Sequence, residues 1–481
     1  MIADRVLKEL RSLVGRANVL DRLVDLQTYE YDAYMERSLP GAVVFVHSTD
    51  EVASVVKLLH SNGIPFTPRG AGTCCSGGSL TPEGGVTIEM CRMNRILEID
   101  IPNQRMTAQS GVFNFDLSTA LSPYGYYFAP DPASQKASML GGNIAENAGG
   151  PHCFKYGVTS NHVLGMEVVL PDGEVVWFGG KSVDAPGLDL AGLFVGSEGT
   201  LGIVTTAILR ITRKPEAVKT ILAVYESIEA ASNTVSAIVG AGLVPATLEM
   251  MDSLVIQAVE DAKACGYPRD AGAVLIIELD GLRDGMDEMT DQIIACCEEN
   301  GAREVRVATN EAEQTALWKG RKGAHGAVSR LAPNFMTADS SVPRNKLPEA
   351  LRRVAEIGCE FDIRVGTICH AGDGNLHPML FFDSRVEADK RNVIAAGMEI
   401  LRMCAALGGT VSGEHGIGVE KIDAMRFVLS EEDLRAQFLV KDAFDPDQLC
   451  NPGKMLPADV VGQAPAGEEG CCTETGVNAY V

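Results

Sequence analysis

The chain has 481 residues, 46% of them hydrophobic, and a formal net charge of −23 at pH 7. This length suits two or three domains better than one. A strongly acidic surface repels nucleic acid and anionic membranes, so we expect neither as a partner, and a small anionic substrate would need locally basic residues.

Residues 1–217 predict a domain in which short helices alternate with short apolar strands. The segments that we expect to be regular are an amphipathic helix at 1–15, a strand at 41–46, a helix at 50–63 that ends at Gly63, and a strand at 64–69. Residues 138–157 indicate a glycine-rich loop region, and 163–179 two strands joined by a Pro-Asp-Gly turn.

Residues 218–441 predict a second α+β domain built from β-α-β units. Residues 442–457 form a compact closing segment, and the small, polar residues of 458–481 indicate a flexible tail. No apolar run is long enough to span a bilayer, and the first residues lack the features of a signal peptide. We therefore expect a cytoplasmic protein.

Three glycine-rich stretches fall in the first domain: PRGAGTCCSGGSL (68–80), SMLGGNIAENAGG (138–150) and GSEGTLGIVT (196–205). The first follows a strand and would expose several backbone N–H groups to a pyrophosphate. It is not a dinucleotide fingerprint, because Cys75 stands where that pattern has glycine. Alone it is more typical of an ordinary tight loop, but three such stretches are hard to explain as turns.

His370 and His377 flank the sequence AGDGNL, which favours a hairpin whose turn is Gly372–Gly374. A hairpin would let both imidazoles face one point, and Glu414 in SGEHGIG is a candidate third ligand. Two histidines and a carboxylate can bind zinc, iron(II) or manganese with open positions. The hairpin alone slightly favours the alternative, two hydrogen-bonded loop histidines.

Six motifs occur in one order along the chain: PRGAGT, GGNIAENAGG, GSEGTLGIVT, HAGDGNLHP, GEHGIG and NPGKMLP. In them the chain resembles the FAD-linked oxidases with the vanillyl-alcohol-oxidase type FAD fold. The likeness is to the branch of D-lactate dehydrogenase, glycolate oxidase large subunit and D-2-hydroxyglutarate dehydrogenase. It implies an α+β fold with a PCMH-type FAD-binding domain of two α+β subdomains (1–217), an α+β substrate (cap) domain with a metal site (218–441), and a return to the flavin at 442–457.

The resemblance also implies which residues hold FAD. Those expected at the pyrophosphate are Pro68, Arg69, Gly70, Ala71, Gly72, Thr73, Gly77 and Gly78. Those expected along the flavin and its phosphates are Ser138, Gly141, Gly142, Asn143 and Gly149. Gly199 and Ile203 would contact the adenosine or ribityl part, and Asn451 the isoalloxazine. No histidine lies between residues 61 and 151, so we expect FAD to be bound non-covalently.

By the same resemblance, His370, His377 and Glu414 bind a divalent metal that holds the substrate's hydroxyl and carboxylate groups. His415 is then the proton acceptor. Arg321, three residues after a tryptophan in WKGRKGAH, would bind the substrate carboxylate. We expect Lys322 to be solvated, and His325, one helical turn beyond Arg321, is a candidate for the same pocket.

The implied reaction is oxidation of a small (R)-2-hydroxy acid by hydride transfer to FAD. The resemblance implies a lysine at the position of Thr337 and a polar residue at that of Met379 in relatives that oxidise D-2-hydroxyglutarate. Neither is present here, so we expect a smaller substrate, D-lactate first and glycolate second. None of the thirteen cysteines forms a C-x-x-C pair, so electrons would pass to an electron-transfer flavoprotein or an iron–sulfur subunit. The chain is a possible homo-oligomer. The competing classes are a non-redox flavin transferase, an electron-relay flavoprotein subunit and a metal-dependent hydrolase.

Overall fold

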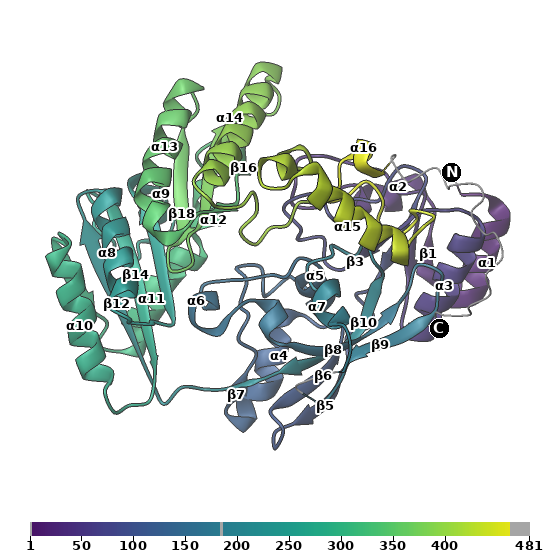
Figure 1. The fold of residues 1–481 in the computed structure, drawn as a ribbon, viewed down its shortest axis with the longest axis horizontal. Helices are drawn as coiled ribbons and strands as arrows, with labels where there is room; N and C mark the ends of the chain where they lie inside the picture. Colours follow the sequence, from purple (N-terminus) through teal and green to yellow (C-terminus); the bar gives the residue numbers. More distant parts are fainter. Residues whose placement is uncertain (1, 183–185, 462–481) are drawn as a thin grey trace, which may run out of the picture.

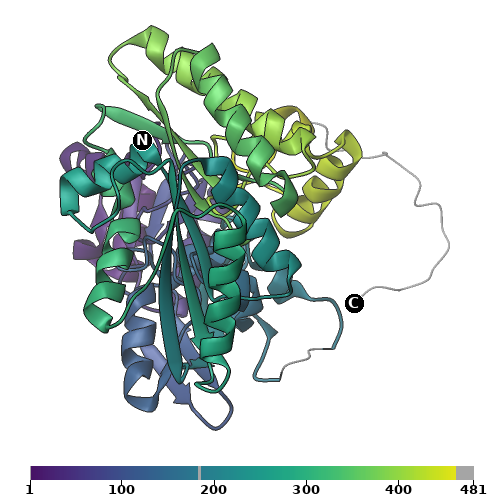
Figure 2. The ribbon, with the colours of Figure 1, turned by 90° about the vertical axis from the view of Figure 1, so that its left-hand side faces the viewer.

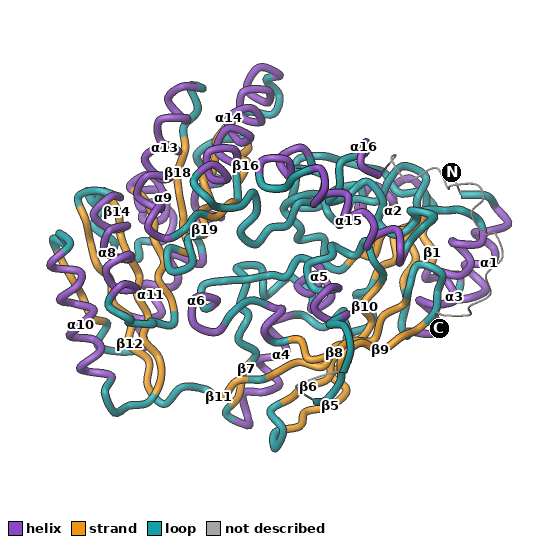
Figure 3. Tube along the Cα trace, viewed as in Figure 1, coloured by secondary structure: helices purple, strands orange, loops and turns teal. Residues whose placement is uncertain are grey.

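The computed structural model describes residues 2–182 and 186–461 and consists of two main parts and a C-terminal segment that packs against them (Figure 1). We call residues 2–216 the N-terminal part, residues 217–410 the cap part and residues 411–461 the return segment. Strands gather in two groups, one in each of the first two parts (Figure 3). No helix among the described residues is long and apolar enough to cross a membrane.

The N-terminal part begins with a small sheet of strand order β1-β2-β4-β3. Its strands are β1 (Val19–Leu20), β2 (Ala42–Phe45), β4 (Val86–Glu89) and β3 (Phe66–Arg69), the last three parallel. Helices α1 (Asp4–Val14) and α3 (Thr49–Ser61) cover it with buried leucines and valines, and Ser48 caps α3 through the Glu51 N–H. The predicted helices and strands are thus confirmed, and β3 ends where the first glycine loop starts.

This part also contains a five-stranded antiparallel sheet of order β5-β6-β10-β8-β9 and a two-stranded one of β7 (Tyr126–Tyr127) and β11 (Thr212–Arg213). The strands of the five-stranded sheet are β5 (Ile96–Asp100), β6 (Arg105–Gln109), β10 (Ile203–Arg210), β8 (Val163–Val169) and β9 (Val175–Gly179). Helices α4 (Asn114–Leu121), α5 (Leu140–Ala145) and α7 (Leu190–Phe194) share its core.

The expected loop at 138–157 is only partly a loop. It contains α5 and a second short helix, α6 (Cys153–Tyr156). Glycines at 141 and 142 lower the helix propensity of this stretch, but Leu140 and Ile144 are fully buried in the core of the antiparallel sheet. Tertiary packing therefore overrides the local preference here.

The cap part holds an eight-stranded antiparallel sheet, with order β15-β12-β14-β13-β18-β19-β16 and β17 paired to β19. Its strands are β12 (Ala217–Tyr225), β13 (Thr247–Asp252), β14 (Ala273–Gly281), β15 (Glu304–Val307), β16 (Asn334–Thr337), β17 (Ser340–Ser341), β18 (Val365–His370) and β19 (Asn375–Phe382). Strands β12 and β13 form a β-α-β unit, as predicted, but β14 is inserted between them.

Helices cover both faces of this sheet. Figure 2 shows the molecule with the cap part facing the viewer. Helices α8 (Ile228–Gly240), α10 (Met286–Glu299), α13 (Leu347–Glu360) and α14 (Glu387–Ala406) pack on one face. Helices α9 (Ser253–Lys263), α11 (Glu311–Lys322) and α12 (Ala324–Val328) pack on the other.

The return segment packs back onto the N-terminal part. Its helix α15 (Glu431–Phe444) places Phe444 against Phe194, with ring centroids 5.2 Å apart. Farther on, the Asn451 N–H donates to the Phe66 carbonyl at 2.7 Å, beside β3. Contrary to the tail expected from residue 458, α16 (Ala458–Val461) is a helix with Val460 buried; the rest of that expectation, 462–481, lies outside the described residues.

Candidate active site

The two histidines lie on a β-hairpin, which confirms the predicted turn. His370 ends β18, His377 lies near the start of β19, and the pairing sets His370 opposite Asn375 and Ile368 opposite His377. Residues opposite each other or two apart share a face of the sheet, so both imidazoles project from the same face. Their ring centroids are 5.1 Å apart at an interplanar angle of 89°.

Glu414 of the return segment completes a three-residue cluster. Its Oε1 lies 3.2 Å from His370 Nε2 and 3.3 Å from His377 Nε2, and one ligand atom from each residue falls within 4.8 Å of the others. Burial opposes charge at His370, yet Glu249 and Glu414 raise its pKa well above its usual value. The cluster thus favours positive charge, and its donor atoms fit a divalent metal.

Glu249 stands directly behind His370. It lies on β13 opposite His370, and its Oε1 is 2.7 Å from His370 Nδ1. A carboxylate on Nδ1 fixes the tautomer of the ring and directs Nε2 toward a metal. The sequence interpretation missed Glu249, although a glutamate within the apolar strand ATLEMMDS was a usable signal.

Arg321 is paired to this same carboxylate. Its Nη2 lies 2.5 Å from Glu249 Oε2, and its side chain is only 3% exposed. The Nε of Arg321 has no hydrogen-bond partner among the described residues, and Arg321 does not line the cavity described below. The structure therefore places Arg321 behind His370, with one donor group unused.

Trp318 anchors the helix that carries Arg321. Its Nε1 donates to Glu278 Oε2 at 2.5 Å, on the strand next to that of Glu249. Lys322 is exposed, as expected, but it lies at the rim of the cavity. His325 lines the cavity, and burial lowers its pKa to about 3, so its ring is neutral.

His415 lies beside the cluster, stacked on His377 with ring centroids 5.0 Å apart. Burial lowers the pKa of His415 to about 4, so near pH 7 the ring is neutral and can accept a proton. The backbone N–H of His415 donates to Asp339 Oδ2 at 3.0 Å, and Lys421 Nζ donates to the same oxygen at 3.1 Å. Asp339 Oδ1 is also 3.5 Å from His377 Nδ1, so a buried carboxylate lies near Nδ1 of both hairpin histidines, Glu249 at His370 and Asp339 at His377.

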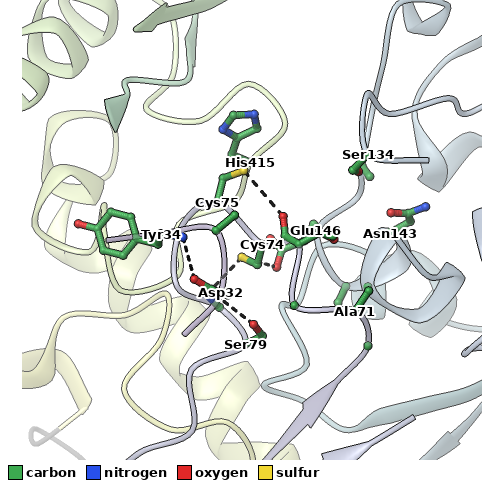
Figure 4. Close-up of a pocket in the computed structure, with 18 of the residues that line it drawn as sticks. Asp32, Tyr34, Ala71, Cys74, Cys75, Ser79, Ser134, Asn143, Glu146 and His415 are labelled. Carbon is green, nitrogen blue, oxygen red and sulfur yellow. Dashed lines mark hydrogen bonds between the residues drawn. The ribbon is translucent and has the colours of Figure 1, made fainter. Parts of the chain in front are cut away.

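A cavity of about 830 Å³ opens beside Glu414 and His415. The predicted cofactor residues that line it are Pro68, Arg69, Gly70, Ala71, Gly72, Thr73, Gly78, Gly141, Gly142, Asn143, Gly199 and Ile203. In Figure 4, His415 lies above Cys75 of the first glycine loop, whereas Ser134 and Asn143 lie beyond Glu146. The cavity therefore connects all three glycine-rich stretches with the histidine cluster.

Four predicted cofactor residues lie outside this wall: Gly77, Ser138, Gly149 and Asn451. Asn451 is buried, and its side-chain NH₂ group already donates to two backbone carbonyls, that of Gly78 at 3.0 Å and that of Glu198 at 2.7 Å. A side chain at Gly149 would begin 2.8 Å from Glu414 Oε2, so Gly149 borders the histidine cluster.

The cavity fits a cofactor such as FAD. Its volume of about 830 Å³ is at the upper end of small-molecule sites, roughly 300–1,000 Å³, and its wall includes residues of all three glycine-rich stretches. Two lining residues, Ser110 and Glu146, each have a buried oxygen with no hydrogen-bond partner in the described structure. Such atoms are rare unless a ligand or water satisfies them.

Two family models match this chain. The model described as "FAD linked oxidases, C-terminal domain" covers residues 214–455, and the one described as "FAD binding domain" covers residues 40–179. Among solved structures, p-cresol methylhydroxylase with bound substrate gives a TM-score of 0.80 at 17% identity, covering 95% of this chain and 97% of that one. A 4-ethylphenol oxidase from Gulosibacter chungangensis gives 0.78 at 19% identity, covering 95% and 98%. These structures share the fold.

Curated relatives match along almost the whole chain. A glycolate oxidase subunit GlcD of Escherichia coli K12 is 41% identical over 94% of this chain and 91% of its own length. The subunit of that name in Bacillus subtilis is also 41% identical, covering 95% and 98%. A D-lactate dehydrogenase of Anaerostipes hadrus is 36% identical, covering 92% and 94%. The chain thus belongs to the family of FAD-linked oxidases.

Proposed function

We propose that this protein oxidises a small 2-hydroxy acid, glycolate or D-lactate, to the corresponding 2-oxo acid with FAD and a divalent metal. The observation that carries the proposal is the cluster of His370, His377 and Glu414 beside His415, at the wall of the glycine-lined cavity. The relatives named glycolate oxidase and D-lactate dehydrogenase support the choice of substrates.

The cluster residues have separate roles in this proposal. When bound, the metal would polarise the substrate hydroxyl and FAD would take up the hydride from carbon. His370, His377 and Glu414 hold the metal. His415 accepts the hydroxyl proton on its neutral ring, for which its pKa of about 4 leaves a free nitrogen lone pair near pH 7.

For Arg321 to bind the substrate carboxylate, its guanidinium must reach the cavity, because in this structure Arg321 pairs with Glu249 and does not line the cavity. Its Nε is buried without a partner, and its guanidinium is held by Glu249 rather than free to turn. A guanidinium fixed by one carboxylate can still present its remaining donors to a second one. This arrangement would fix the distance between the substrate carboxylate and the metal-bound hydroxyl group.

The wall near His415 sets the size and charge of the substrate. Phe335, Met336 and Thr337 line it and carry no charge, and Met379 lies buried opposite Thr337. Lys322 reaches only the rim, with its amine over the Trp318 ring at 5.1 Å. A substrate with a second carboxylate would find no buried cation in this wall, which disfavours D-2-hydroxyglutarate.

A substrate panel tests this choice. With a dye as electron acceptor, kcat/KM should be highest for glycolate or D-lactate and at least about tenfold lower for L-lactate and D-2-hydroxyglutarate. A preference for D-2-hydroxyglutarate would show that the charge argument is wrong. Thr337→Lys supplies the missing cation, and it should raise kcat/KM for D-2-hydroxyglutarate relative to D-lactate.

Electrons must then leave the flavin. The sequence has no C-x-x-C pair, and we propose an electron-transfer flavoprotein or an iron–sulfur subunit as the acceptor. Slow reoxidation by air and fast reoxidation by one of these partners would support the assignment. Rapid turnover with oxygen alone would make a partner unnecessary.

A further inference from the structure

The loop that carries Glu414 and His415 is held from both sides by buried carboxylates. On the cap side, Asp339 accepts from Ser412 Oγ at 2.9 Å and from the N–H groups of Gly413 and His415 at 3.0 Å. On the other side, Glu198 of the N-terminal part accepts from the Ile417 N–H at 2.6 Å and the Gly418 N–H at 2.7 Å. The loop is therefore suspended between the two parts of the molecule.

Glu198 is constrained to make these bonds. It is 5% exposed, and its φ of +51° lies in the left-handed region that non-glycine residues seldom adopt. Its own backbone is fixed by the N-terminal part and the return segment, because its N–H donates to the Ala145 carbonyl and its carbonyl accepts from Asn451. A residue held in an unfavourable backbone conformation by several hydrogen bonds often has a functional side chain, here the carboxylate that bonds to the loop.

The contact between Glu198 and the loop is tight. A side chain on Gly416 would begin 2.9 Å from Glu198 Oε1 and 2.2 Å from Glu146 Oε2, and Gly416 has a φ of +83°. The loop can lie this close to both carboxyl groups only with glycine at position 416. Glu198 also lines the cavity, so one residue contacts both the cavity and the loop of Glu414 and His415.

We propose that Glu198 is a positioning residue that sets the place of Glu414 and His415 from the flavin-binding side of the molecule. This inference rests on the proposed function, because it assumes that Glu414 binds a metal. The carboxylate of Glu198 bonds to the N–H groups of Ile417 and Gly418 rather than to His370, His377 or Glu414. It acts through the backbone N–H groups of Ile417 and Gly418, which follow His415 and Gly416 in the loop.

The test compares Glu198→Gln with Asp445→Asn. Asp445 is the control: it is fully buried, accepts from two consecutive N–H groups, those of Leu449 and Cys450, and also pairs with Lys441, but it does not line the cavity. Each amide variant places an NH₂ group against a backbone N–H. Both should destabilise the fold, so an effect specific to Glu198 can be separated from general loss of stability.

The first readout is Co²⁺ titration of chelator-treated, flavin-loaded protein, followed by the visible spectrum of the cobalt. Residues that orient metal ligands typically change metal affinity by about 10–100-fold. Glu198→Gln should weaken Co²⁺ binding at least about tenfold and alter the spectrum, whereas Asp445→Asn should leave affinity within about twofold of wild type. Equal Co²⁺ affinity in Glu198→Gln and wild type would overturn the inference.

Amide hydrogen exchange gives a second readout that needs no metal. In Glu198→Gln, exchange should rise at Gly413–His415, whose N–H groups are bonded to Asp339, and not only at 417 and 418. An increase confined to 417 and 418 would overturn the inference. If wild-type protein takes up no Co²⁺, the proposed function is wrong, and the exchange pattern alone then decides the role of Glu198.

Discussion

The cavity and the histidine cluster lie side by side but are built differently. Three glycine-rich stretches, each contiguous in the sequence, supply about half of the residues that line the cavity. The cluster instead uses side chains brought together by strand pairing and the return segment, with Glu249 behind His370 and Asp339 behind His377. We therefore expect the cavity to bind its ligand mainly by shape and the cluster to bind its ligand mainly by charge. If so, substitutions should separate flavin retention from the rate of substrate oxidation.

We expect the largest difference between flavin retention and the rate of substrate oxidation in Glu414→Gln. Loss of the carboxylate removes one ligand and most of the negative charge at the cluster, so the metal should be lost while FAD stays bound. The rate of flavin reduction by substrate should fall about a thousandfold or more, since metal polarisation contributes several kcal/mol. Anaerobic stopped-flow absorbance measures it, and a rate near that of wild type would place the chemistry elsewhere.

The converse substitution is Gly72→Val in the cavity wall. Gly72 has a φ of +65°, and a side chain there would begin 2.2 Å from Arg69 Nη2. FAD affinity should fall at least about tenfold, while Co²⁺ affinity stays unchanged. Gly125→Val is the control, because Gly125 has a φ of +75° but open space around it. Equal FAD loss in both variants would mean that backbone strain, not the wall, is responsible.

A smaller loss of metal affinity is expected when Glu249, which bonds to His370 Nδ1, is substituted. Glu249→Gln keeps the shape but removes the charge that orients His370 and pairs with Arg321. Metal affinity should weaken about tenfold, at the lower limit for residues of this kind. Glu278→Gln, on the neighbouring strand, should leave metal affinity near wild type. If the two variants weaken metal binding alike, Glu249 has no specific role in orienting the metal site.

The smallest effect on the active site concerns the junction of the two parts. His152 lies 2.9 Å from Asp131 and 3.2 Å from Glu278 of the cap part, and it stacks on Trp318. Burial opposes its charge, but the two carboxylates raise its pKa to about 10, above roughly 6.5 in the unfolded chain. The resulting stability is fully present below about pH 6.5 and is lost as pH rises toward 10.

Thermal unfolding from pH 6.5 to 10 measures this contribution. The wild type should lose on the order of 4 kcal/mol more stability over that range than His152→Gln, whose side chain does not titrate. Lys155, which pairs with Asp280 across the same junction, is present in both proteins and therefore cancels from the comparison. Parallel curves for wild type and variant would show that the charged form of His152 does not hold the junction.

The sequence is informative where function depends on neighbours along the chain. The hairpin of His370 and His377 could be predicted because its turn and both strands are local. The glycine stretches could be assigned for the same reason. Helix α5 could not, because its glycines suit a loop and only the burial of Leu140 and Ile144 makes it a helix.

The supporting carboxylates could not be predicted, because each acts on a distant partner. Glu249 meets His370 only through the pairing of β13 with β18, and Glu198 meets the loop of Glu414 only when the return segment packs on the N-terminal part. No local pattern identifies such contacts. A buried glutamate in an apolar strand raises the question of a partner, but the sequence does not say which residue it is.

The most direct test of the account is anaerobic reduction of the bound flavin by glycolate and D-lactate, before and after treatment with a chelator. We predict that substrate bleaches the flavin band, that chelation abolishes bleaching without releasing FAD, and that added Zn²⁺ or Mn²⁺ restores it. Bleaching that survives complete removal of metal would contradict the assignment of His370, His377 and Glu414. A flavin that stays oxidised with every 2-hydroxy acid, with metal present, would contradict the proposed function itself.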